Sequence, residues 1–359
     1  MRAQQSSANA DVPRARDLVL RYGWNATAYQ IVNPGFEHWF SAAGDAVVGF
    51  VRAAGACVVA GAPVCTNERL DAVIAEWEEW CRANRRRTIY FGAAGRVHER
   101  LANRRGYSMI VLGAQPSWDP ARWAETIDAR RSLRAQFRRA RNKGVAVAEW
   151  PVAQAERNAD FTAILTEWLS TRGLPPLHFL IEPQTLSDLA GRRIFVAERH
   201  SRPVGFLTAS PIPARHGWLT EQFVRGASAP NGTVELMIDA AARTLAMDGA
   251  EYLTMGLVPL SDPATVDPGN PLWVRWLLAW VRAHGRRFYD FNGLAAFKAK
   301  FRPHSWEPIY AVANEPRVSP RTLYAIAAAF TRRSPLALLF SVLGGAAKQE
   351  LRWLFNSRR

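Results

Sequence analysis

Short apolar runs alternate with segments of helical spacing through the first third of the chain, and this alternation restricts the fold more than any other feature. Residues 46–52 and 56–60 read as strands, and residues 67–84 place apolar side chains at helical spacing. The pattern continues with a strand at 88–91, a helix at 97–105 and a strand at 107–112. Strands that alternate with helices in this way predict an α/β fold.

The second half of the chain repeats the alternation. We predict a helix at 161–170, a hairpin of strands at 193–198 and 203–209, a strand at 218–224, a helix at 231–247, a strand at 252–257 and a helix at 271–284. A chain of 359 residues can form two cores, because single domains usually contain about 100–200 residues. We therefore predict two α/β domains.

The composition favours an anionic partner. The net charge is +15 and 48% of the residues are hydrophobic, which is typical of a globular protein and not of a disordered one. Such a charge indicates nucleic acid or an acidic lipid surface, although a solvated arginine-rich surface is the alternative. The three cysteines and seven histidines have no metal-ligand spacing, so we predict no metal site.

Neither a signal peptide nor a membrane span is evident. Residues 1–13 are polar and small, and no run reaches the roughly 18–20 apolar residues that a span needs. Unpaired small cysteines also suit a reducing compartment. These features predict a cytoplasmic protein.

Residues 130–143 are the most basic segment, with seven basic residues and no acidic one. On a helix one face would carry Arg130, Arg134, Arg138 and Arg141, and another face would be apolar. A one-sided basic stripe is suited to a phosphate backbone. The alternative is a solvated linker between domains.

Residues 288–310 contain two of the four lysines of the chain, in which nearly all other basic residues are arginine. Lys298 and Lys300 would supply compact ammonium groups that can titrate, which arginine does not. The alternative is a helix with Leu294, Phe297 and Phe301 in the core and both lysines in solvent.

This segment, read with the stretches 229–235 and 253–261, resembles the phosphatidylglycerol lysyltransferase (multiple peptide resistance factor) family. The shared features are, in chain order, Pro-Asn-Gly at 230–232, Gly-Leu-Val-Pro-Leu-Ser at 256–261, Phe-Tyr-Asp-Phe-Asn-Gly-Leu at 288–294 and Phe-Lys-Ala-Lys-Phe at 297–301. The resemblance covers roughly residues 20–312 and leaves out the family's membrane flippase.

The resemblance implies two tandem acetyltransferase-like (GNAT) folds joined by the basic helix. The expected division is a disordered start at 1–19, a first domain at 20–118, the basic helix at 119–144, a catalytic domain at 145–315 and an amphipathic tail at 316–359. The implied enzyme is an acyltransferase that moves an amino acid from aminoacyl-tRNA to a hydroxyl of phosphatidylglycerol or a related lipid. No coenzyme A loop is evident, so no cofactor is expected.

The same resemblance assigns site residues. Glu221 and Arg225 stand where the family has Asp-x-x-Arg-Arg, with Val224 in place of the first arginine; an exposed ion pair is the alternative. The expected catalytic residues are Glu221, Arg225, Lys298 and Lys300. The expected substrate-binding residues are Asn231, Glu235, Gly256, Ser261 and Asn292, and the expected tRNA-binding residues are Arg130, Arg134, Arg138 and Arg141.

The carboxy-terminal segment 334–347 is apolar with basic flanks, so we predict that the tail binds the cytoplasmic face of an anionic membrane. Docking on the domain or on a second subunit is the alternative. Two other functions stay open, namely another aminoacyl or N-acyl transferase and a non-catalytic module that binds tRNA or lipid. A separate flippase is a further expected partner. The amino acid, the lipid acceptor, the oligomeric state and the lysine that acts in the site are not fixed by the sequence.

Overall fold

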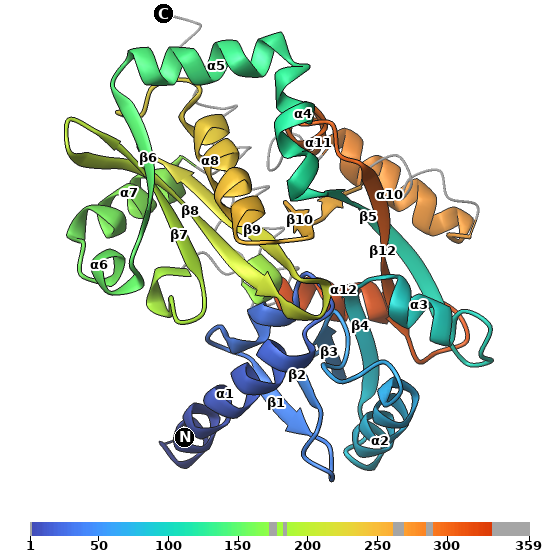
Figure 1. Ribbon diagram of the computed structural model, residues 1–359. Helices are drawn as coiled ribbons and strands as arrows, with labels where there is room; N and C mark the ends of the chain where they lie inside the picture. The colour runs from blue at the N-terminus through green and yellow to red at the C-terminus, as the bar shows by residue number, and fades with distance from the viewer. Residues whose placement is uncertain (1, 172–177, 182–184, 261–268, 285–289, 332–359) are drawn as a thin grey trace, which may run out of the picture.

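The strands of the computed structural model form one mixed sheet (Figure 1). The structure describes residues 2–171, 178–181, 185–260, 269–284 and 290–331. The strands are β1 (Glu37–Phe40), β2 (Val47–Ala53), β3 (Ala56–Ala60), β4 (Arg87–Ala93), β5 (Ser108–Trp118), β6 (Val145–Trp150), β7 (Arg193–Arg199), β8 (Arg202–Ile212), β9 (Gly217–Arg225), β10 (Tyr252–Thr254), β11 (Val258–Pro259) and β12 (Ser305–Ala313). Their order is β1-β2-β3-β4-β12-β5-β10-β9-β8-β7-β6, and β11 also pairs with β5.

Helices cover both faces of the sheet (Figure 1). The described α-helices are α1 (Arg2–Tyr22), α2 (Leu70–Ala83), α3 (Gly95–Leu101), α4 (Trp123–Asp128), α5 (Arg131–Asn142), α6 (Val152–Glu156), α7 (Ala159–Ser170), α8 (Thr233–Met247), α10 (Leu272–His284), α11 (Phe291–Ala299) and α12 (Pro320–Thr331). Neighbouring residues of a strand point to opposite faces. On β7, Phe195 accordingly packs in the core beneath α8, while Ile194 and Val196 pack in the core beneath α7.

The α/β class is confirmed, and two halves of similar design follow each other along the chain. Each half has one parallel pair of strands, β3 with β4 in the first half and β9 with β10 in the second. Strands are also exchanged between the halves. The late strand β12 lies between β4 and β5, and the early strand β5 extends to pair with β10. Residues 305–313, which we expected in the second domain, therefore lie in the first half of the sheet.

Two local expectations were wrong. The disordered start expected at 1–19 is helix α1, whose Ala15, Leu18 and Val19 are buried in the first core. The strand expected at 107–112 is longer than predicted, because β5 continues through Pro116 to Trp118. Pro116 lies opposite Trp306 of β12, and its carbonyl accepts a hydrogen bond from Thr254 Oγ1 at 2.8 Å.

The beginning of the expected tail belongs to the fold. Helix α12 packs on β2, β3 and β4, with Ala325 and Ala329 buried in the first core. Residues 332–359 lie outside the described part of the chain, and the predicted membrane-binding segment 334–347 is among them. Within the described ranges, no helix combines the length and the apolar character needed to cross a bilayer.

A cationic side chain ties the halves together at their junction. The Arg215 guanidinium lies 3.4 Å from the centre of the Tyr252 ring and forms a two-pronged ion pair with Glu307 of β12. Two parallel N–H···O bonds between a guanidinium and a carboxylate are the strong form of such a pair. The pair therefore helps to hold β12 against the second half.

Candidate functional site

The sheet opens where β9 leaves β10. Only Tyr252–Thr254 pair with β9, at Gly217–Leu219, whereas β9 continues to Arg225 with β8 as its partner. Helix α11 packs beside the opening, with the Phe297 ring 5.8 Å from the Phe223 ring of β9. Where two parallel strands diverge, their facing backbone groups lose the neighbouring strand as a partner and must pair with side chains or a ligand, which makes this opening the candidate site.

Lys298 is buried at this opening. Its side chain leaves α11 and donates to the carbonyl oxygens of Met255 at 2.6 Å, Gly256 at 2.9 Å and Leu257 at 3.1 Å. Burial lowers the pKa of Lys298 to about 7. The three carbonyl acceptors favour a higher pKa, because only the ammonium form of the lysine has three N–H donors to satisfy them. The lysine therefore fixes the backbone that follows β10.

Lys298 is expected to make the stability of the fold depend on pH. An unfolded lysine has a pKa of about 10.4, whereas the pKa of Lys298 is about 7. Between these values the unfolded chain binds more protons, so the contribution of Lys298 to the free energy of unfolding rises with pH and is flat below pH about 7. Urea unfolding at about pH 6.5 and about pH 9 should show this rise in the wild type. The same rise in Lys298→Met would contradict the assignment.

Lys300 has different partners. Its ammonium lies 2.5 Å from Glu235 Oε1 in the first turn of α8 and 4.0 Å from the centre of the Phe297 ring. The side chain is part-buried, with 26% of its surface exposed. Residues two apart on a helix face different directions. Only Lys300, of the two lysines, thus combines an accessible ammonium with a position at the start of α8.

Glu221 lies at a β-bulge in β9, because Gln222 and Thr220 face consecutive residues of β8. Both of its carboxylate oxygens accept from Arg192, at 2.9 and 3.3 Å, and Ser210 also donates to it. Burial alone would raise the pKa of Glu221, but Arg192 and Ser210 hold it below the ordinary value. The structure thus places Glu221 in a buried ion pair and not in the exposed pair with Arg225 considered above.

Arg225 and Asn231 meet at the end of β9. Arg225 Nη1 lies 3.4 Å from Asn231 Oδ1, and both side chains are exposed. Gly232 follows with φ +95°, and a Cβ there would lie 2.3 Å from the Gln136 carbonyl of α5. Only glycine permits this contact. The first turn of α8, whose N–H groups suit an anion, is therefore held directly against the basic helix.

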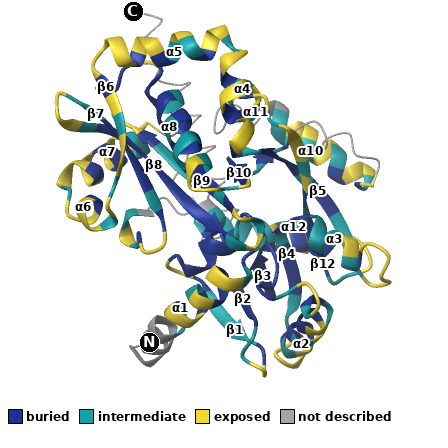
Figure 2. Cartoon of the chain, in the orientation of Figure 1, coloured by how far each residue is buried: buried dark blue, intermediate teal, exposed yellow. Residues whose placement is uncertain are grey.

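The basic segment 130–143 forms helix α5 over 131–142, and its apolar face is buried through Leu133, Phe137 and Ala140. This helix is shorter than the one expected at 119–144, because residues 123–128 form the separate helix α4. Of the four expected tRNA-binding arginines, Arg138 and Arg141 are exposed and Arg130 and Arg134 are half-buried. Arg141 also lies 3.9 Å from Asp239 of α8. Figure 2 shows that the outer side of α5 is exposed along its length. A role in tRNA binding remains a prediction.

The remaining expected substrate-binding residues have separate places. Gly256 has φ +74°, and its carbonyl accepts from Lys298. Asn292 Oδ1 accepts two hydrogen bonds from Arg282 of α10, each at 3.1 Å. Ser261 lies outside the described residues.

Sequence reasoning missed Arg192 and the side chains from the first half that surround it. Arg192 Nη2 donates to Asn33 Oδ1 at 2.6 Å, and its guanidinium lies 5.1 Å from the centre of the Tyr29 ring. Asn33 and Tyr29 are distant from Glu221 in the chain, so no spacing links them. The only available signal was that a buried carboxylate requires a cationic partner.

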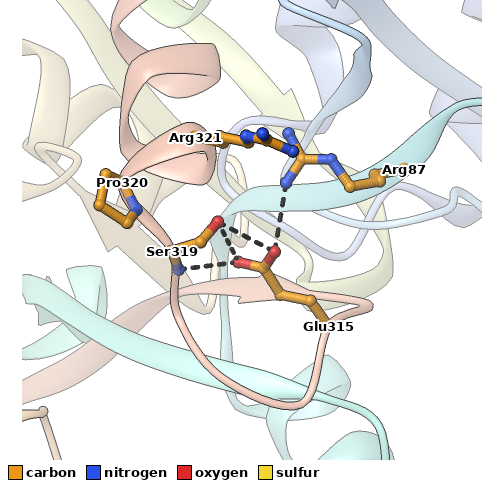
Figure 3. A pocket seen from close by; sticks show the side chains of 5 residues that line it. All are labelled: Arg87, Glu315, Ser319, Pro320 and Arg321. Atoms are coloured by element: carbon orange, nitrogen blue, oxygen red, sulfur yellow. Dashed lines mark hydrogen bonds and ion pairs between the residues drawn. The ribbon is translucent and has the colours of Figure 1, made fainter.

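A surface pocket elsewhere is lined by charged side chains that already interact with other groups of the protein. Its lining is Arg87, Glu315, Ser319, Pro320 and Arg321 (Figure 3). The Glu315 carboxylate accepts from Arg87 Nη1 at 3.2 Å and from the Ser319 backbone N–H at 3.0 Å. Glu315 therefore stabilises the start of α12. Among the residues that the structure describes, no cluster of three His, Cys, Asp or Glu side chains is placed to hold a metal.

The fold and site together define an α/β protein of two linked halves that presents lysine and arginine side chains where two parallel strands diverge. The family model described as phosphatidylglycerol lysyltransferase, C-terminal, matches residues 16–313. The chain belongs to this family, as the sequence resemblance predicted.

Individual relatives agree with this assignment. The phosphatidylglycerol lysyltransferase of Bacillus subtilis (strain 168) is 22% identical over 328 residues, which are 90% of this chain and 38% of that protein. The chain thus spans well under half the length of this relative.

Two solved structures share the fold. One is the C-terminal domain of a putative lysylphosphatidylglycerol synthetase from Agrobacterium fabrum, with a TM-score of 0.75, 21% identity and coverage of 90% of this chain and 98% of that one. The other is L-PGS from Bacillus licheniformis, with a TM-score of 0.68, 19% identity and coverage of 92% and 95%.

Proposed function

We propose that this chain transfers an aminoacyl group, lysine or another, from aminoacyl-tRNA to a hydroxyl of phosphatidylglycerol. Family membership supports the lipid acceptor and the transfer reaction. The observation that carries the proposal is the contact of Gly232 with α5, since it places a basic helix beside an anion-binding helix start and Lys300. A phosphate-rich donor and a phosphate-bearing acceptor both need such a surface.

The reaction is an ester exchange. The lipid hydroxyl oxygen forms a bond with the aminoacyl carbonyl carbon, and the bond from that carbon to the tRNA ribose oxygen breaks. The hydroxyl proton ends on the ribose oxygen. Lys300 and the first-turn N–H groups of α8 supply positive charge for the oxyanion or the adjacent phosphate, while Lys298 positions the backbone after β10. Arg225 and Asn231 contact the substrate at the exposed end of β9.

The direct test combines the purified protein, aminoacyl-tRNAs carrying different amino acids and phosphatidylglycerol in detergent. Mass spectrometry of the extracted lipid should show one new aminoacylated phosphatidylglycerol that requires intact aminoacyl-tRNA. An N-acylated peptide or amine product would indicate the other transferase. Binding of tRNA and lipid with no product from any aminoacyl-tRNA would indicate a non-catalytic module.

Charge reversal on α5 is expected to weaken tRNA binding. Arg134→Glu with Arg138→Glu removes two phosphate contacts and adds repulsion, so affinity should fall about tenfold or more and the salt dependence should become shallower. Filter binding over a salt series measures both effects. Arg82→Glu with Arg105→Glu is the matched control, because both arginines are exposed in the first half, on α2 and before β5. Equal losses in the two variants would show that only net charge matters.

A lipid acceptor would require the protein to work at a membrane. We propose that it acts as a peripheral protein on the cytoplasmic face, with a separate flippase as a further partner.

A further inference from the structure

Helix α10 carries a row of large apolar side chains that are exposed to solvent. The exposed fractions are 41% for Trp273, 76% for Trp276, 59% for Trp280, 38% for Leu277 and 69% for Leu272. Trp273, Trp276, Leu277 and Trp280 follow helical spacing and form one stripe, which we call the tryptophan face. Large apolar side chains gathered on one surface mark an interaction site.

The helix is nevertheless firmly docked through its other side. Val274 is fully buried in a cluster with Ile110 of β5 and Ala311 of β12, and Leu278 packs against the same cluster. Asn270, just before the helix, accepts from the Val111 N–H at 2.8 Å and donates to the Val111 carbonyl at 3.3 Å. The tryptophan face is therefore presented outward by a fixed support (Figure 2).

We infer that the tryptophan face docks on the interface of an anionic phospholipid bilayer. Tryptophan is the side chain most suited to the headgroup region, because its ring is apolar and its N–H is polar. The helix contains Arg275 and Arg282 and no carboxylate, and the whole chain carries a net charge of +15. This charge attracts an anionic surface and opposes association with a second copy of the chain. The inference rests on the proposed function for the identity of the lipid.

The docking helix is joined directly to the candidate site. Arg282 on α10 donates twice to Asn292 on α11, and α11 leads into Lys298 and Lys300. A bilayer against the tryptophan face would thus lie next to the element that bears the site lysines. With the helix docked, a lipid headgroup could reach the opening while the acyl chains of the lipid stay in or near the bilayer.

Vesicle flotation tests the inference with the full chain. Phosphatidylglycerol vesicles should bind the wild type. The triple variant Trp273→Ser/Trp276→Ser/Trp280→Ser should have an affinity for these vesicles that is lower by about tenfold or more, where each factor of ten corresponds to about 1.4 kcal/mol of binding free energy. The matched variant with phenylalanine at all three positions should keep most of the binding. Vesicles of phosphatidylcholine, a zwitterionic lipid with no net charge, should bind the wild type poorly. Wild-type flotation by the serine variant overturns the inference.

Two further measurements exclude other occupants of the face. A wild-type dimer that the serine substitutions convert to a monomer, seen by light scattering, would assign the face to a second copy and overturn the inference. Because the tail contains Trp353, the tail is tested in Trp353→Phe. A rise in tryptophan quenching by acrylamide when residues 332–359 are deleted from that variant would assign the face to the tail and overturn the inference likewise. A molecular mass that the serine substitutions leave unchanged, together with quenching that the deletion leaves unchanged, supports docking of the face on a bilayer.

Failure of this inference is separable from failure of the proposed function. Transfer to phosphatidylglycerol dispersed in detergent should survive in the serine variant, while transfer to vesicles should fall with flotation. A wild type that floats with vesicles but transfers nothing in detergent refutes the proposed function alone. A serine variant that loses transfer equally in detergent and on vesicles refutes the docking role alone.

Discussion

Replacing Lys300 by alanine is expected to lower turnover by about 10²–10³-fold, the usual effect of removing one donor to a developing negative charge. Lys300 is the part-exposed ammonium beside the start of α8, with Glu235 as its neighbour. Its loss should change kcat far more than KM, because the charge it meets is greatest in the transition state. Steady-state transfer with phosphatidylglycerol and aminoacyl-tRNA measures this split.

Lys298→Ala is the informative comparison. That change removes the donor to three backbone carbonyls, so it should lower the free energy of unfolding as well as activity. Lys300→Ala should keep a near wild-type unfolding curve, because its ion pair is partly exposed. Full activity in Lys300→Ala would make its segment a packing element and remove it from the mechanism.

The second large effect concerns the buried pair of Glu221 and Arg192. Glu221→Ala leaves Arg192 buried without its counter-charge, and we expect a loss of about 3–5 kcal/mol in unfolding free energy. Arg192→Met combined with Glu221→Leu should recover most of that stability, since an apolar pair needs no desolvation of charge. Urea unfolding of the single and double variants gives both values.

The double variant also separates stability from function. We expect it to fold and yet to transfer nothing, because Glu221 sits at the bulge where β9 leaves β10. That result is consistent with a carboxylate that binds the donor's ammonium and with one that positions the strand end. If transfer returns together with stability, Glu221 and Arg192 serve only folding.

Sequence periodicity predicted the elements whose faces are strongly apolar. The helices over 67–84 and 231–247 are present as α2 and α8 with small shifts at their ends, and the apolar face of α5 is buried. The spacing of apolar residues along the chain is sufficient to predict such helices. By contrast, α1 was missed because residues 1–13 are polar, and its burial depends on distant partners in the first core.

The site was predictable in its residue types and not in its pairings. A resemblance named Glu221, Lys298 and Lys300, but their roles depend on partners from remote elements. Arg192 and the carbonyls of Met255–Leu257 reach these side chains only after the sheet has formed. The strand β12 was missed for a similar reason, because its neighbours β4 and β5 belong to the other half.

The exchange of β5 and β12 has a consequence during synthesis. Until residues 305–313 emerge from the ribosome, the position between β4 and β5 has no strand to fill it. Residues 119–304 are made in that interval, so the first half cannot complete its sheet before nearly all of the second half exists. A nascent chain of this protein should therefore need protection of two open strand edges until late in translation. A gene cut between the halves should yield two fragments that fold only when they are produced together.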